Sequence, residues 1–302
     1  MMEPYAALPV SSKDYYDSVP SADQYSGDIW SDIPSFGILP LEFVTGLVVT
    51  PACDLANRKA ETITLLPVLP IHSYLSSISF LPELKRSLEG QLSAGGMGSL
   101  LSLPPGYIRP TKGDLTAMKE MVTSSLSESG LSAKARGSLA RAVSGIDLLG
   151  MTCTGSVTRD STEKVKHLMG DKAFGDLLSK IVRNGYRLDL HFLPSDEQKR
   201  EWAGVAEHSV ALFRYPVTVP TELLDLAQAT REDAWTGVVD HLSPMYPCAD
   251  RFSRRPLKRL RVRPRFMSDL LTRFTAVFSR LGSPDFTDNT VARYVKEMGG
   301  AS

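Results

Sequence analysis

The chain has 302 residues and a mass of 33.1 kDa, enough for one large domain or two smaller ones. Hydrophobic residues make up 42% and charged residues 23%, a globular composition that excludes a wholly disordered or collagen-like chain. Because 34 basic residues balance 34 acidic ones, net charge alone indicates no attraction to nucleic acid or to a membrane.

Cysteine and histidine usage predicts neither a disulfide framework nor a metal site. The cysteines are few and widely spaced, at positions 53, 153 and 248, and no histidine pair has HxxxH spacing. Free cysteines are typical of a reducing compartment, so we expect a cytoplasmic protein. No secretory signal is recognisable, no apolar run reaches the roughly 18 residues of a membrane-spanning helix, and no motif indicates a cofactor.

The first half of the chain divides into three kinds of segment. Residues 1–25 contain three prolines and no helical or strand period, which predicts a disordered tail. We expect deletion of residues 1–24 to leave the melting temperature nearly unchanged. Residues 26–75 are typical of β structure, with clear buried strands at 46–50 and 62–71. Residues 76–185 predict a helical insertion, with helices at 81–92, 114–127, 131–149 and 161–184, the last containing Gly170 as a place for a kink.

The second half predicts further strands and then helices. Alternating apolar residues at 186–194 and 209–219 predict two strands that complete the earlier sheet. Residues 221–302 predict a C-terminal helical region with a basic segment at 251–265, and its helices are expected at 221–241, 269–281 and 287–298. The predicted fold class is therefore α+β.

Three short motifs follow one another in residues 26–75. Gly-Asp-Ile-Trp stands at 27–30, an apolar strand ends in Thr50 and Pro51, and a further strand leads from Ile63 to Pro70. In order and spacing they resemble the PemK/MazF-like family, which folds as a small SH3-like β-barrel. The resemblance covers under a fifth of the chain.

The resemblance implies a small bent barrel. It is built from residues 26–75 and about 186–220, with the helical segment inserted between them and the C-terminal helices following. The rival architecture is a separate barrel followed by a helical domain. A second likeness, of residues 52–55 together with 270–284, is to a group of uncharacterised bacterial proteins and implies no activity.

Toxins of the PemK/MazF-like family cut single-stranded RNA without a metal ion. The resemblance therefore implies a metal-independent endoribonuclease and gives Thr50 the role of the hydroxyl that the family places after its apolar strand. The basic side chain that the family also needs is absent, because residues 31–45 contain neither lysine nor arginine. Such a cation stabilises the charged transition state of phosphate chemistry. The alternative for Thr50 is an ordinary β-branched strand residue.

Cys53 and Asp54 form the sharpest local pair in the sequence. As a nucleophile, Cys53 needs a lowered pKa, and His72 is the nearest histidine along the chain that can supply a positive charge. The alternative is a small buried cysteine, with Asp54 accepting backbone N–H groups in the next loop. We expect this structural role, in which Cys53→Ala costs about 1 kcal/mol of stability.

The segment 251–265 has eight basic residues and no acidic one. Arginine-rich clusters suit phosphate contact, so we predict binding of RNA or DNA. Two prolines argue against a long helix there and favour an extended or loop-like backbone. The alternative is a solvated loop that pairs with the protein's own acidic face or tail. The residues predicted to bind nucleic acid are Arg254, Arg255, Lys258, Arg259, Arg261 and Arg263.

Two function classes remain open. The first is a prokaryotic nucleic-acid-associated protein of toxin or anti-phage defence type. The second is a non-catalytic protein-interaction module, in which the β structure is a scaffold and the arginine segment grips a protein partner. The position of the basic segment in the folded chain discriminates between the two classes. If the segment lies next to Thr50 and Cys53, one of its arginines can replace the cation that is missing after the first strand, which favours the first class.

Overall fold

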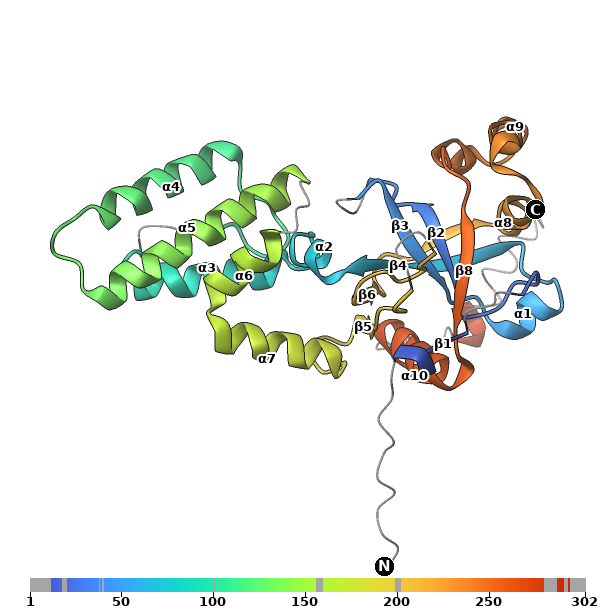
Figure 1. Ribbon diagram of the computed structural model, residues 1–302, viewed down its shortest axis with the longest axis horizontal. Helices are drawn as coiled ribbons and strands as arrows, with labels where there is room; N and C mark the ends of the chain where they lie inside the picture. Colours follow the sequence, from blue (N-terminus) through green and yellow to red (C-terminus); the bar gives the residue numbers. More distant parts are fainter. Residues whose placement is uncertain are drawn as a thin grey trace, which may run out of the picture.

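The structure, a computed structural model, describes residues 12–17, 21–37, 39, 41–99, 102–155, 160–198, 202–279, 287–290 and 293. It is mixed α/β, with an antiparallel sheet at one end and a group of helices at the other (Figure 1). The short helix α2 (Ile71–Leu75) lies where the two parts meet.

The sheet has eight strands in the described part of the chain, and each is antiparallel to its neighbours. Across the sheet, the order is β1 (Tyr16–Asp17), β8 (Leu257–Val262), β2 (Asp28–Pro34), β3 (Phe43–Val48), β4 (Thr62–Pro70), β6 (Ser209–Leu212) and β5 (Leu190–Leu193). The remaining strand, β7 (Val217–Pro220), pairs with the first half of β4, and β6 pairs with its last residues. The sheet is open, so the closed barrel implied by the resemblance is wrong.

Burial on both faces explains why the sheet stays open. Neighbouring residues of one strand enter different cores: Trp30 packs on one side and Ile29 on the other, and Leu65 and Leu66 repeat the pattern on β4. A small barrel encloses a single core on its inner face. Here helices cover both faces and bury the apolar side chains of the strands, so closure into a barrel is not needed to bury them.

Three further helices pack around the sheet. The helix α10 (Pro264–Phe278) covers one face and buries Met267 and Leu270, while α8 (Thr221–Ala229) and α9 (Trp235–Leu242) contribute to the core of the opposite face. In Figure 1, α10 lies below the sheet and α8 and α9 lie at its upper right. The expected helix at 221–241 is therefore interrupted, and the one expected at 269–281 begins earlier, at Pro264. Most of the helix expected at 287–298 lies outside the described residues.

In its described residues, the predicted helical insertion forms five helices beside the sheet. They are α3 (Leu81–Ala94), α4 (Lys112–Leu126), α5 (Ala133–Thr154), α6 (Asp160–Met169) and α7 (Asp171–Val182). Local signals set their ends: Thr111 and Asp114 cap α4 reciprocally, and Ser132 caps α5. The helix expected at 161–184 is two helices rather than one kinked helix, because Gly170 has a φ of 81°.

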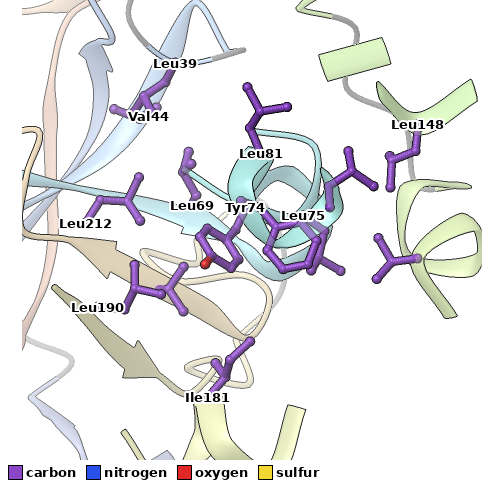
Figure 2. Packing of buried hydrophobic residues seen from close by; sticks show 14 of the residues in the cluster. Leu39, Val44, Leu69, Tyr74, Leu75, Leu81, Leu148, Ile181, Leu190 and Leu212 are labelled. Carbon is purple, nitrogen blue, oxygen red and sulfur yellow. The ribbon is translucent and has the colours of Figure 1, made fainter. Parts of the chain in front are cut away.

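The sheet and the helices share one hydrophobic core. Tyr74 of α2 is fully buried and lies between apolar side chains of both parts (Figure 2). Its surroundings include Leu69, Leu190 and Leu212 from the strands and Leu81, Leu148 and Ile181 from the helices. The apolar side chains of the two parts are therefore buried against one another in a common cluster.

Two further segments differ from the expectation drawn from sequence. Within the predicted tail, Tyr15 and Tyr16 are buried and β1 pairs with β8, so a loose tail is wrong for these residues. The centre of the basic segment, expected in a helical region, forms β8 (Leu257–Val262) in the interior of the sheet, between β1 and β2. Its extended backbone was predicted, but its place in the sheet was not. Among the described residues, no helix has both the length and the apolar character needed to cross a membrane.

Candidate functional site

Thr50 has a structural partner. It is buried just beyond β3, where its Oγ1 accepts a hydrogen bond of 2.7 Å from the backbone N–H of Thr64 in β4. The hydroxyl oxygen therefore joins the ends of two neighbouring strands. This contact matches the strand-residue alternative for Thr50.

Cys53 is exposed, so the expectation of a buried cysteine is wrong. The physical reason is the short helix α1 (Ala52–Ala56), which buries Leu55 and leaves Cys53 facing outward. The Sγ atom of Cys53 lies 3.6 Å from Oδ1 of Asp54, a weak hydrogen bond to sulfur.

We therefore expect Cys53→Ala to change the free energy of unfolding by less than about 0.5 kcal/mol, because an exposed side chain away from caps and networks contributes little. Urea denaturation of the wild type and the variant measures the difference. A loss of about 1 kcal/mol or more in the free energy of unfolding, the size expected when a buried side chain is truncated, contradicts the exposed position.

His72 lies at the far end of β4 from Thr50 and Cys53. The strand from Thr64 to Pro70 spans about 20 Å at roughly 3.4 Å per residue, and His72 follows it on α2. Its Nδ1 lies 3.1 Å from a carboxylate oxygen of Glu207. The four residues predicted as catalytic therefore do not converge, and His72 is not placed to activate Cys53.

The basic segment is neutralised largely by the protein itself. At its centre, Asp28 is fully buried and contacts two cations: Lys258 Nζ at 3.1 Å and Arg261 Nε at 2.8 Å. The Lys258 side chain is only 3% exposed and also donates to the backbone carbonyls of Ser21 and Asp23. Burial lowers the pKa of Lys258, and the Asp28 carboxylate opposes that shift. These two cations serve the fold.

The other predicted nucleic-acid-binding residues also have partners within the chain. They pair as Arg254 with Asp32 (3.8 Å), Arg255 with Glu232 (3.1 Å), Arg259 with the Ser31 hydroxyl (3.1 Å) and Arg263 with Asp17 (2.9 Å). These pairs match the alternative in which the segment faces the protein's own acidic residues. Thr50 follows β3, and β2 lies between β3 and β8 in the sheet. The arginines of β8 are therefore not on a strand that neighbours β3.

A different cluster lies in an open cleft of about 790 Å³ at the junction of sheet and helices. We call it the Arg–Asp cleft. Its residues come from the loops before α3 and α4, the approach to β5, the β6–β7 turn and α10. They are Ile78, Tyr107, Arg187, Leu188, Asp189, Arg214, Tyr215 and Val277.

The centre of the Arg–Asp cleft is one buried carboxylate between two guanidinium groups. Arg187 binds Asp189 through two hydrogen bonds, Nε to Oδ1 at 2.8 Å and Nη2 to Oδ2 at 2.7 Å. Arg214 Nε donates to Oδ2 of the same carboxylate at 2.6 Å. The Asp189 side chain is 8% exposed and the Arg214 side chain 60%. Arg187 also donates to the backbone carbonyl of Ser79 at 2.6 Å, which fixes the cluster to the chain.

The ionisation of this cluster is fixed by its pairing. Burial raises the pKa of Asp189, but hydrogen bonds and charge attraction from Arg187 and Arg214 outweigh it and leave the pKa below its usual value. Burial lowers the pKa of Arg187, but its contacts with Asp189 raise it above the usual value. Tyr215 stays protonated, because burial raises its pKa. Near neutral pH the lining residues therefore carry two positive charges and one negative charge.

Asp54 lies in a second cleft, of about 850 Å³, between α1, α8 and the chain before β2. Three carboxylates, Asp23, Asp54 and Asp225, and one guanidinium, Arg58, line it. Asp225 accepts a hydrogen bond of 3.0 Å from Gln24. Within the described residues, no group of three or more histidine, cysteine, aspartate or glutamate side chains is arranged to hold a metal ion.

A buried histidine–tyrosine pair lies under α10. His191 of β5 shares a hydrogen bond of 2.9 Å with the Tyr15 hydroxyl, and its Nδ1 lies 3.9 Å from Asp269. Burial lowers the pKa of His191 to about 4, against the opposing attraction of Asp269 and with a smaller contribution from Arg273. The folded protein therefore holds His191 neutral at pH values where an unfolded chain has begun to protonate it.

This pair predicts a pH dependence of stability. Between the unfolded pKa of 6.5 and the folded value of about 4, the unfolded chain binds a proton that the folded chain rejects, so stability falls as pH falls through this window. On lowering the pH from 7 to 4.5, we expect the wild type to lose about 2 kcal/mol more stability than His191→Gln. Urea denaturation at both pH values measures this difference, and equal losses contradict it.

Sequence reasoning missed the Arg–Asp cleft. Tyr186 to Asp189 were predicted as the start of a strand, whereas β5 begins only at Leu190. Two charged residues flanking Leu188 in an otherwise apolar alternation were the available local signal. The partner Arg214 lies in a turn 25 residues after Asp189, and no local pattern joins the two.

Comparison of the chain with protein-family models, curated proteins and solved structures finds no match. The function is therefore inferred from the chemistry of the sites above.

Proposed function

We propose that this protein is a non-catalytic interaction module that docks a partner protein at the Arg–Asp cleft. The observation that carries the proposal is the combination, in one open cleft, of a fixed Arg187–Asp189–Arg214 cluster with exposed apolar side chains. Tyrosine and arginine in a concave, partly apolar setting are the residues that dominate protein–protein binding energies.

Exposure of the apolar side chains supports the proposal. Tyr107 and Leu188 in the cleft are about half exposed, and Ile108 and Phe278, each next in sequence to a lining residue, are exposed further. Isolated exposed apolar residues are ordinary, but a group around a polar anchor is typical of a docking surface. A partner that covers these side chains removes apolar area from water and gains a polar anchor at the same site.

Co-purification from the native host tests the proposal. The protein is expressed there as the wild type, as Leu188→Ser and as the matched control Met245→Ser, whose methionine is equally exposed but lies outside the cleft. We expect a stoichiometric partner protein with the wild type and the control, and its loss with Leu188→Ser. If Leu188→Ser retains the partner, or the wild type purifies alone at native abundance, the cleft is not the docking site. Bound nucleic acid is scored in the same samples.

The prokaryotic nucleic-acid-associated function of toxin or anti-phage type is the second candidate. The favouring observation is that Arg254, before β8, and Arg265, in the first turn of α10, have side chains 63% and 57% exposed. Their contacts with the carboxylates of Asp32 and Asp14 are long, at 3.8 and 3.9 Å, although Arg265 also donates to the Asp14 backbone carbonyl at 2.9 Å. A phosphate can compete with such long, exposed ion pairs. We propose no ribonuclease activity, because the Thr50 hydroxyl oxygen is engaged and the cation of the family pattern is missing.

Salt dependence tests this second candidate. If Arg254 and Arg265 contact phosphates, Arg254→Gln/Arg265→Gln flattens the slope of log affinity against log salt by roughly one unit for each contact. Fluorescence anisotropy with a labelled single-stranded RNA and a DNA duplex measures the slopes. The control is Arg231→Gln, whose side chain is 89% exposed elsewhere on the surface. Equally weak binding by wild type and double variant at low salt rejects nucleic-acid binding by β8.

A further inference from the structure

The Arg–Asp cleft contains one cation with unused hydrogen-bonding groups. Arg214 donates Nε–H to Asp189, and the two Nη groups at the end of its guanidinium remain turned to solvent, since the side chain is 60% exposed. A guanidinium carries five N–H donors, so four of them stay available to a ligand. These donors suit a planar oxyanion, which they bind through two parallel hydrogen bonds.

The cleft is organised before any ligand binds. Asp189 is buried and holds Arg214 at 2.6 Å, and Arg187 fixes Asp189 from the other side with two hydrogen bonds. Arg187 is itself fixed by the Ser79 carbonyl. A receptor whose side chains are already oriented loses less conformational entropy on binding, so more of the contact energy appears as affinity.

Apolar and aromatic walls stand beside this cation. Ile78, Leu188 and Val277 line the cleft, together with Tyr107 and Tyr215. The loop that carries Tyr107 is fixed from below, because the buried Lys85 donates to the backbone carbonyls of Pro104 and Gly106 at 2.6 and 2.9 Å. A ligand seated here therefore meets a charged contact and an apolar contact at the same time.

The charge of the lining residues selects the kind of anion. Two guanidinium groups face one carboxylate, which leaves a single positive charge. A carboxylate brings one negative charge and balances it, whereas a phosphate monoester carries about −1.5 to −2 near neutral pH and exceeds it. The apolar walls, in turn, favour a bulky hydrophobic group attached close to that carboxylate.

We propose that the Arg–Asp cleft binds a peptide segment that presents a carboxylate directly beside a large apolar side chain, with the carboxylate on Arg214 and the apolar group against Leu188 and Val277. This inference rests on the proposed function and specifies the chemistry of the partner. The carboxylate comes from an acidic side chain or from a free C-terminus, and the two sources are separable by experiment.

Selection from random peptides tests the proposal without a known partner. Two libraries are displayed against the purified full-length protein, one with free C-termini and one with both ends tethered. We expect enrichment of an acidic group next to Phe, Trp, Leu or Ile. Enrichment only from the free-ended library assigns the carboxylate to the C-terminus, and enrichment from both assigns it to Asp or Glu.

Selected peptides are then synthesised and measured by fluorescence anisotropy. Replacing the carboxylate by its amide, or Arg214 by Gln, is expected to weaken binding at least about tenfold, because a charge-assisted contact is lost. The double change is expected to cost little more than either single one, since both remove the same contact. Arg231→Gln is the control and keeps full affinity. The exposed position of Arg214 makes a folding defect unexpected, and circular dichroism checks it.

Three results overturn the proposal. The first is no enrichment of any motif, and the second is enrichment of basic or phosphomimetic sequences without an adjacent apolar residue. The third is that Arg214→Gln leaves the affinity of the selected peptides unchanged. These outcomes are distinct from failure of the proposed function. If Leu188→Ser loses the native partner but the peptides fail, the cleft docks a partner of different chemistry. If the peptides bind as expected but no native partner is lost, the cleft recognises a carboxylate ligand that is not a stable protein partner.

Discussion

Replacing Asp28 by asparagine is expected to lower the free energy of unfolding by about 3–5 kcal/mol, the usual consequence of removing one member of a buried ion pair. Asp28 is fully buried and is the carboxylate shared by Lys258 and Arg261. Without it, the Lys258 ammonium, whose side chain is 3% exposed, keeps the carbonyls of Ser21 and Asp23 and the Trp30 ring as neighbours but loses its paired carboxylate. Urea denaturation monitored by tryptophan fluorescence measures the change.

Two further variants make this result specific. Asp32→Asn removes a partner of Arg254 that lies 3.8 Å away at a more exposed position, and we expect a cost below about 1 kcal/mol. Adding Lys258→Met to Asp28→Asn removes the uncompensated charge and is expected to recover part of the loss. If Asp28→Asn lowers the free energy of unfolding by less than about 1 kcal/mol, as the loss of an exposed ion pair does, the buried charge cluster does not stabilise the sheet as described.

Deleting residues 1–20 is expected to destabilise the protein by about 3–5 kcal/mol, which reverses the prediction made from sequence. The deletion removes β1 and the buried Tyr15 and Tyr16, and the burial of a large apolar side chain is worth about 1.5–3 kcal/mol. Tyr15 stacks on Phe266 of α10 with ring centroids 4.2 Å apart, and the Tyr16 hydroxyl donates to the Pro194 carbonyl at 2.6 Å.

A point variant separates these contacts from the rest of the segment. Tyr16→Ala is expected to cost about 2–4 kcal/mol, from lost burial and an unpaired carbonyl, while Trp202→Ala, at an aromatic residue 67% exposed, is expected to cost little. Thermal and urea unfolding of the deletion and both variants give the comparison. An unchanged melting temperature for the deletion restores the original interpretation of a dispensable tail.

The sequence alone determined the parts of the fold that depend on local patterns. Alternating and β-branched residues located β3 and β4, and the helical period located the helices between Leu81 and Val182. These signals are local because strand and helix periods are written within a few residues. The same patterns indicated an α+β chain, which the mixed architecture agrees with.

Only the tertiary structure decided how the segments combine. Charge density in 251–265 indicated an exposed polyanion-binding segment, but Asp17, Asp28 and Asp32 come from the other end of the chain and pair with it across the sheet. Likewise, Tyr15 and Tyr16 showed no period, because their burial is provided by α10 and β5 rather than by their own neighbours. Ion pairs and apolar contacts between segments more than 200 residues apart leave no trace in a local pattern.

The same reason explains the sites. Cys53 and His72 are close in sequence, but Cys53 lies before β4 and His72 after it, so the length of this strand separates them. Arg187, Asp189 and Arg214 lie in segments of ordinary composition. Only the tertiary structure, in which β5 and β6 contact α7 and α2, brings them into one cleft with Tyr107 and with Val277 of α10. An extended strand holds the residues at its two ends far apart, even when few residues separate them in sequence. Pairing between strands, in contrast, brings together segments that are distant in sequence.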